Sequence, residues 1–163
     1  GKTPWGSPIE LNSTEKAAWY SKGYRAAVAE QQGLCLGSYA FLWGHKQETT
    51  ATWFGMLLPD GKRLQAVDVM TSAWTGSTPS NRCPRIESLQ VDRATFRPGE
   101  TCQAALTTND PEGDALNFRW ILRADSSTIG TGGDAQRREA AYPKAVTARG
   151  PQASVVLPKV PGG

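Results

Sequence analysis

Residues 34–43, which read LCLGSYAFLW, decide the fold expected for the first half of this chain. The segment is apolar almost throughout and has no continuous polar face. A strand that is buried on both faces has this pattern, as in a parallel sheet that helices cover on each side. We therefore predict a buried strand here, which needs neighbouring strands along both edges.

Helical patterns flank this segment on both sides. Asn12 or Ser13 offers an N-cap before it, with Glu15 placed three residues after Asn12 as in a capping box. Small, apolar and aromatic residues then recur at three- and four-residue spacing as far as Val28. After the segment and a polar loop, residues 62–74 carry a second amphipathic helical pattern. Helix, buried strand and helix in this order predict part of an α/β fold.

The character of the chain changes near residue 80. Five of the six tryptophans come before that point, and residues 77–84 are dense in turn-forming residues, which is typical of a linker. Beyond it, four segments have strand-like patterns: 85–91, 101–107, 116–122 and 153–157. Short strands separated by turns predict a β-sandwich, and four strands make it a partial one. The polar stretch 125–150 is expected to be a loop.

The predicted fold class is therefore α/β followed by all-β, in three parts: an α/β portion over 1–76, a linker over 77–84 and a partial sandwich over 85–163. The chain begins with Gly1 rather than Met and ends without a charged tail, which suggests a piece of a longer polypeptide. A net charge of +3 without a concentrated basic stripe argues against nucleic acid as a partner. No apolar run approaches the roughly 18 residues of a membrane helix.

The three cysteines are at positions without zinc-binding spacing. Cys35 lies in the apolar segment and is expected to be a buried thiol. Cys83 and Cys102 pair only if they fall opposite each other on adjacent strands, and otherwise stay free.

The loop after residues 34–43 carries the side chains that suit a sugar site. Aromatic rings stack on the C–H faces of sugars, and charged or amide groups bond the hydroxyls. The candidate substrate-binding residues are Trp43, His45, Lys46, Gln47, Glu48 and Trp53. An ordinary polar loop between two packing tryptophans explains the same residues.

Several stretches resemble glycoside-hydrolase barrels of the family 2 type. These are GSYAFLWG at 37–44, TPWG at 3–6 and AVDVM at 66–70. The resemblance implies the final βα portion of a TIM-type barrel over 1–76, with Trp43 as the floor of a sugar subsite. It also implies a bacterial parent protein that is extracellular or periplasmic.

The resemblance leaves the catalytic groups outside this sequence. Retaining glycosidases need two carboxylates about 5–5.5 Å apart. In the family these groups stand on the fourth and seventh strands, which would lie before Gly1, and neither Glu10 nor Glu48 matches them. We therefore predict no catalytic residue in this chain, which alone should be inactive.

The sequence DPEGD at 110–114 resembles the turn of PKD-like and cadherin-like repeats, which are immunoglobulin-type sandwiches. The carboxylates of Asp110, Glu112 and Asp114 can supply oxygen ligands to calcium. Asp and Gly also fill tight turns for conformational reasons alone. Calcium is the one cofactor that the sequence suggests, and a plain turn is the alternative.

Three functions follow from these patterns. The favoured one is a piece of a carbohydrate-active enzyme that hydrolyses glycosides, with Trp43 as the stacking platform. The second is a carbohydrate-binding protein without catalysis. The third is an adhesion or spacer role for the sandwich. Carbohydrate is the expected partner in the first two, and the sequence predicts no oligomeric state.

Overall fold

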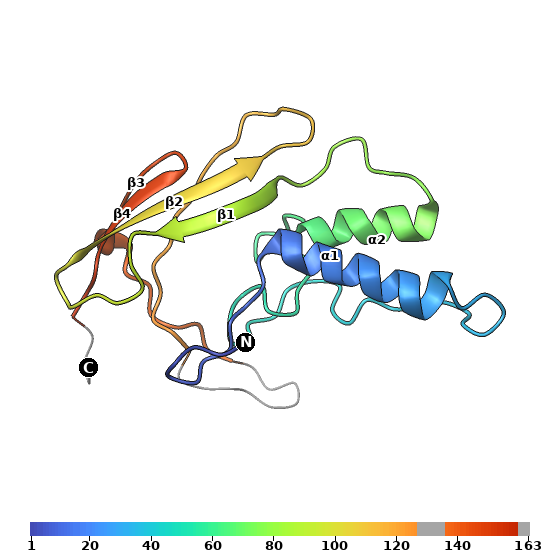
Figure 1. Cartoon of the computed structure of the whole chain (residues 1–163), viewed down its shortest axis with the longest axis horizontal. Helices are drawn as coiled ribbons and strands as arrows, with labels where there is room; N and C mark the ends of the chain where they lie inside the picture. Colours follow the sequence, from blue (N-terminus) through green and yellow to red (C-terminus); the bar gives the residue numbers. More distant parts are fainter. Residues whose placement is uncertain (127–135, 160–163) are drawn as a thin grey trace.

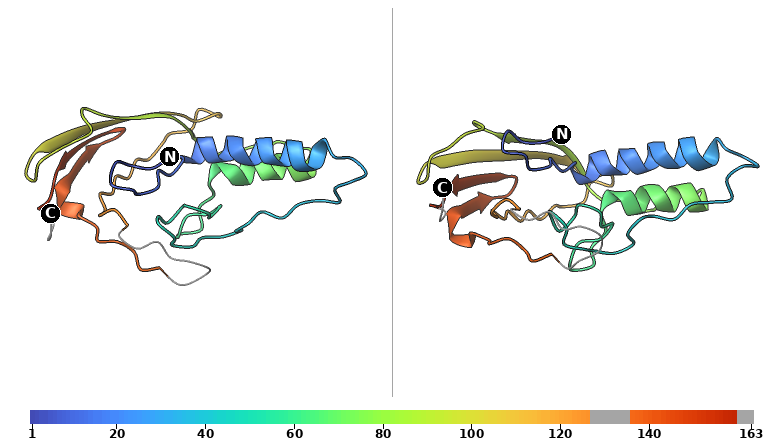
Figure 2. Two further views of the ribbon diagram at one scale, coloured as in Figure 1. Left: turned by 60° about the horizontal axis from the view of Figure 1, so that its bottom comes forward. Right: turned by 90° about the horizontal axis from the view of Figure 1, so that it is seen from below.

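Two helices and one antiparallel sheet form the regular structure of the chain, which a computed structural model describes over residues 1–126 and 136–159. The helix pair and the sheet lie end to end, so that neither helix covers a face of the sheet (Figure 1). Figure 2 shows the same arrangement in two further views. No described helix combines the length and the apolar character that crossing a membrane requires.

The first helix, α1 (Ser13–Tyr24), begins at the predicted capping box. The Asn12 side chain accepts a hydrogen bond from the backbone N–H of Glu15 at 3.0 Å, and the Glu15 carboxylate accepts one from the Asn12 backbone at 2.8 Å. Two of the free N–H groups at the helix start are satisfied in this way. A π-helical turn, Arg25–Ala29, continues the helix. The predicted helix start is confirmed.

The second helix, α2 (Gln65–Thr75), lies beside α1 and ends at Gly76, whose φ of 71° is the left-handed conformation that glycine adopts at low cost. Its buried residues meet Met56, which is fully buried, to form the core of this half. Tyr20 and Tyr24 of α1 pack against that core. The core members are Met56, Ala66, Val67 and Met70.

The sheet has the strand order β1-β2-β4-β3, and every pairing is antiparallel. Its inner face buries Cys102, Ala104 and Ala153, and the register places Ala104 opposite Ala153. The strands are β1 (Arg85–Val91), β2 (Thr101–Asn109), β3 (Val146–Arg149) and β4 (Gln152–Val156). Three of them confirm predicted strands, and β3 falls in the stretch that was expected to be a loop.

A bulge in β1 keeps its apolar residues on one side of the sheet. The register pairs Ile86 with Thr108 and Leu89 with Leu106, and it shifts by one residue just before Ser88. Residues directly opposite each other in a ladder share a face. The extra residue therefore brings Ile86 and Leu89, three positions apart, to the same face.

The predicted barrel portion is wrong. Residues 34–43 form no strand, and the strands of the described chain all lie between Arg85 and Val156 in an antiparallel sheet. Within the described residues nothing pairs with the segment on either edge, and Tyr39 is 100% exposed. An apolar segment becomes a buried strand only when other strands pair with its edges, and no described strand pairs with this one.

The predicted β-sandwich is also wrong, because the described residues form one sheet where a sandwich needs two. Residues 116–122 alternate between half-buried and exposed side chains, as a strand does, but they join no ladder. Their neighbourhood makes one isolated bridge, between Arg123 and Ala141. The Trp120 indole instead donates to the backbone oxygen of Gly150 at 3.1 Å.

All three cysteines are free, and Cys35 is half-buried rather than buried. Cys83 precedes the start of β1, which pairs with Asn109, whereas Cys102 lies at the other end of β2. The two thiols are therefore at opposite ends of the β1–β2 ladder and cannot be bridged.

Asp68 joins α2 to the segment that leads into the sheet. It is buried, accepts a hydrogen bond from the Cys83 backbone N–H at 2.5 Å and lies 3.4 Å from the Arg63 guanidinium. Burial, and then the neighbouring Asp68 carboxylate, raise the pKa of the Cys83 thiol to about 12. At ordinary pH this thiol therefore stays protonated and is a poor nucleophile.

We expect Met56→Ala to lower the free energy of unfolding by about 2–5 kcal/mol, because it leaves a cavity between the helices. Urea unfolding followed by circular dichroism measures this loss. Leu34→Ala removes an exposed side chain of similar size and should change stability by less than about 0.5 kcal/mol. Equal effects of the two substitutions would contradict the assignment of the core.

We expect iodoacetamide at pH 8.5 to alkylate Cys83 at least tenfold more slowly in the folded chain than in urea, since an unperturbed thiol has a pKa of about 8.5. Peptide mass spectrometry measures both rates on the same residue. The raised pKa also predicts that stability declines as the pH rises from the ordinary thiol pKa of about 8.5 toward about 12, because only the unfolded chain releases this proton in that range. Similar alkylation rates in the two states would rule out the buried environment.

Candidate functional site

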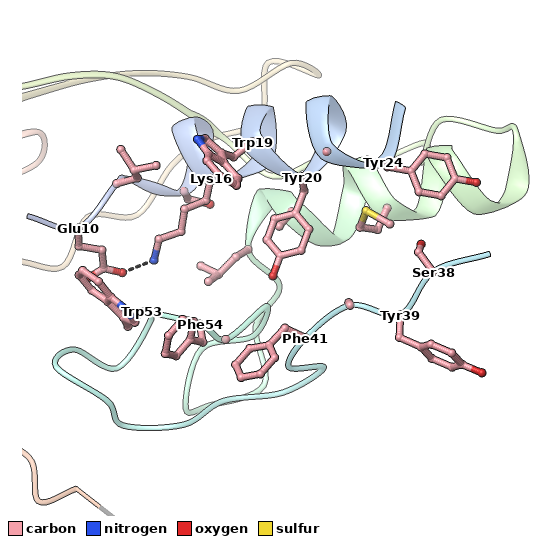
Figure 3. Close-up of a pocket in the computed structure, with 18 of the residues that line it drawn as sticks. Glu10, Lys16, Trp19, Tyr20, Tyr24, Ser38, Tyr39, Phe41, Trp53 and Phe54 are labelled. Atoms are coloured by element: carbon pink, nitrogen blue, oxygen red, sulfur yellow. Dashed lines mark hydrogen bonds and ion pairs between the residues drawn. The ribbon is translucent and has the colours of Figure 1, made fainter. Parts of the chain in front are cut away.

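An open cleft of about 680 Å³ runs along α1 and is the candidate site. One wall is the face of α1 that carries Trp19, Tyr20 and Tyr24, and the other wall is formed by residues 38–41 and 53–55 (Figure 3). Met70 of α2 contributes to the lining. Most of the surface around the cleft is therefore aromatic or aliphatic.

A polar cluster closes one end of the cleft. The Lys16 ammonium donates to the Glu10 carboxylate, and it also donates to the backbone oxygen of Thr52 at 2.5 Å. The hydroxyls of Thr50 and Thr52 donate to the same carboxylate at 2.5 and 2.7 Å. The side chains of Lys16 and Glu10 are only 16% and 20% exposed. This cluster, defined here as the Glu10 cluster, ties the start of α1 to the loop that carries Trp53.

Gly55 sets the position of that loop. A β-carbon at this position would lie 2.8 Å from the backbone oxygen of Gly44 and 3.3 Å from the His45 α-carbon. The close approach lets the Leu57 backbone N–H donate to the Gly44 oxygen at 3.0 Å. Trp53, immediately before this contact, is thereby held at the cleft.

Four of the side chains that line the cleft carry a hydroxyl without a hydrogen-bond partner among the described residues: those of Tyr20, Tyr24, Ser38 and Tyr39. In Figure 3 the Tyr20 side chain points from α1 toward the opposite wall. Burial raises the pKa of the Tyr20 phenol above its ordinary value, so this group is a neutral donor and acceptor at neutral pH. A ligand in the cleft would therefore meet unpaired hydroxyls as well as aromatic rings.

Of the six substrate-binding residues predicted from sequence, only Trp53 lines the cleft. Trp43 instead packs against Trp74, with ring centroids 6.2 Å apart and ring planes 37° apart, and it remains 57% exposed. The other four residues follow Trp43 in a loop outside the cleft lining: His45 and Gln47, and the ion pair of Lys46 with Glu48 at 2.7 Å.

Sequence reasoning missed the residues of α1 that line the cleft. Trp19 is 73% exposed, and Tyr20 lies one position further along the same helix. An aromatic pair on an amphipathic helix usually packs in the core, so the local sequence does not indicate that these two residues line a ligand-binding cleft. No local sequence pattern predicts the ion pair of Glu10 with Lys16 either, because the two residues stand on either side of the helix start.

The DPEGD sequence forms a closed turn. The Asp110 carboxylate accepts from the backbone N–H groups of Glu112 and Asp114, both at 3.0 Å. Glu112 accepts from the Arg82 side chain at 2.7 Å, and the hydrogen bonds from the Arg82 backbone and side chain lower the pKa of that carboxyl. Asp114 accepts from the Asn81 amide at 3.2 Å. The three carboxylates thus hold the turn and the preceding linker.

The described residues contain no group of three or more His, Cys, Asp or Glu side chains that could hold a metal ion. No calcium-binding group is therefore found at the predicted position in the described chain, and no cofactor is supported. Neither a known protein family nor a characterised protein matches this chain.

We expect Glu10→Gln to lower the free energy of unfolding by about 1–3 kcal/mol, because a largely buried Lys16 loses its charged acceptor. Chemical denaturation measures this loss. Glu30→Gln is the matched control, since Glu30 pairs with Arg25 at 3.6 Å with both side chains mostly exposed. That substitution should cost less than about 0.5 kcal/mol. If the two losses are equal, the Glu10 cluster does not hold the cleft together.

Proposed function

We propose that the chain binds carbohydrate in the cleft beside α1, without catalysis by the residues that line it. The single observation that carries this proposal is the combination of exposed aromatic rings and unpaired hydroxyls around one open cleft. Rings such as Trp19 and Trp53 offer flat apolar faces for sugar rings. The hydroxyls of Tyr20 and Ser38 offer partners for sugar hydroxyls.

The polar groups around the cleft support a neutral sugar ligand rather than an ionic one. Lys16 and Glu10 neutralise each other within the Glu10 cluster. The remaining hydrogen-bonding groups of the lining side chains are mainly neutral hydroxyls and indoles. Such a site favours a ligand with alternating apolar faces and hydroxyl edges, which is the chemistry of a neutral oligosaccharide.

Binding is proposed in place of hydrolysis because the cleft lacks a carboxylate pair. Glycoside hydrolysis needs two carboxyl groups, about 5–5.5 Å apart in retaining enzymes. Glu10 is the one carboxylate among the described residues that line the cleft, and it is held by Lys16. A parent enzyme whose catalytic carboxylates lie outside this sequence stays a prediction of the family resemblance, as does a location outside the cytoplasm.

We expect Trp53→Ala to weaken oligosaccharide binding by about tenfold or more, because a buried tryptophan contact contributes on that scale. The chain is titrated by isothermal calorimetry with cellohexaose, xylohexaose, mannohexaose and laminarihexaose, and the tightest of these is used for the variants. Circular dichroism checks that each variant keeps the fold.

Trp43→Ala is the control for this experiment. Trp43 lies outside the cleft lining, so its removal should leave the affinity unchanged. Loss of binding in Trp43→Ala together with normal binding in Trp53→Ala would place the ligand on the loop predicted from sequence. Absence of binding to all four hexasaccharides would remove the support for a neutral glucan, xylan or mannan ligand.

A further inference from the structure

Residues 34–41 present exposed apolar side chains, although Ala40 packs against the core and the Phe41 ring also contacts Phe54. Leu36 and Tyr39 are fully exposed, Leu34 is 84% exposed and Phe41 is 77% exposed. In Figure 3 the Tyr39 ring points away from α1, so it extends from the outer side of the segment. A contiguous group of large apolar side chains in water is typical of a protein interaction surface.

The backbone of the same segment is also unpaired. Within the described part of the chain, residues 38–43 make no backbone-to-backbone hydrogen bond. The segment is irregular and bends at Phe41 and Trp43, so pairing would have to straighten it there. Its free N–H and C=O groups are a template for strand pairing with another polypeptide. Aromatic residues such as Tyr39, Phe41 and Trp43 favour a strand once it is paired.

The chain exposes more solvent-accessible surface than a compact monomer of its mass, and the excess is of the size that a partner would bury. The chain exposes 11461 Å², whereas a compact monomer of 17.6 kDa exposes about 7,900 Å². An allowance for the thirteen residues outside the description, 127–135 and 160–163, at the area per dalton of an unfolded chain comes to only about 1,550 Å² of the difference. Roughly 2,000 Å² of surplus surface therefore belongs to the described residues, and a stable homodimer buries about 2,000–5,000 Å² over both partners.

We propose that residues 36–43 pair with the same residues of a second copy of this chain as an antiparallel two-stranded ribbon. A second copy is the occupant that the geometry favours, because an isologous contact is self-complementary and an antiparallel pair of identical segments satisfies a two-fold axis. The contact joins unpaired backbone to unpaired backbone. Antiparallel overlap of 36–43 with itself places Leu36 of each copy opposite Trp43 of the other, where the two side chains contact each other. The surplus area of one chain is of the size that such a dimer needs.

The proposed ribbon shares residues 38–41 with one wall of the cleft. Leu34 and Leu36, in contrast, are not among the residues that line the cleft. A substitution at Leu36 therefore tests association without removing a cleft side chain.

The test is sedimentation velocity of the chain from 1 to 200 μM, with Leu36→Asp and Ile121→Asp as variants. We expect a concentration-dependent dimer whose dissociation constant rises at least tenfold in Leu36→Asp and stays unchanged in Ile121→Asp. Ile121 is a half-exposed aliphatic residue beyond the helical half, and it serves as the matched control. Circular dichroism on each variant shows whether the helices and the sheet persist.

Hydrogen exchange locates the contact. Amide protection over residues 38–43 should increase between 1 and 200 μM in the unmodified chain and should not increase in Leu36→Asp. A chain that stays monomeric over this range overturns the proposal. So does a dimer that forms without added protection at 38–43, or one that Ile121→Asp weakens as much as Leu36→Asp.

Discussion

The contact of Lys16 with Glu10 and the 50–52 loop is the interaction on which the cleft depends. The two walls of the cleft come from a helix and from irregular chain, and no sheet ladder joins them. A half-buried ion pair loses part of its hydration, and additional hydrogen bonds offset that loss. The hydroxyls of Thr50 and Thr52 provide those bonds. Without the Glu10 cluster, the loop that carries Trp53 would have no polar attachment to α1.

The second constraint is the small amount of buried apolar surface. Among the described residues, the core consists of a cluster around Met56 between the helices and a few small side chains on the inner face of the sheet. Because helices and sheet meet end to end, neither covers the other. Polar contacts join the two halves instead. The Thr14 hydroxyl accepts a hydrogen bond from the Ile86 backbone N–H at 2.8 Å, and the Asp68 carboxylate accepts one from the Cys83 backbone N–H. This arrangement leaves aromatic and aliphatic side chains free to form contacts with ligands or with another polypeptide.

Local signals were sufficient for part of this structure. The capping box of Asn12 and Glu15 acts within one helical turn, and its prediction is confirmed. The strands β1, β2 and β4 follow from alternation within a few residues. The prediction of a buried strand at residues 34–43 was wrong. A segment that is apolar on both faces forms a buried strand only if other strands pair with it. The same dependence on distant partners hid the site, since Lys16 meets Thr52 across 36 positions of sequence.

The tryptophans give the most direct test of the central claim, that ligand binds in the cleft beside α1. The chain has six tryptophans, each with its own indole N–H signal in a nitrogen-15 correlation spectrum. The tightest-binding hexasaccharide is titrated into the labelled chain, with signals assigned by single Trp→Phe substitutions. We expect the signals of Trp19 and Trp53 to move in a saturable way, while those of Trp43 and Trp74 stay in place. Movement of the Trp43 and Trp74 signals, with those of Trp19 and Trp53 unchanged, would contradict it.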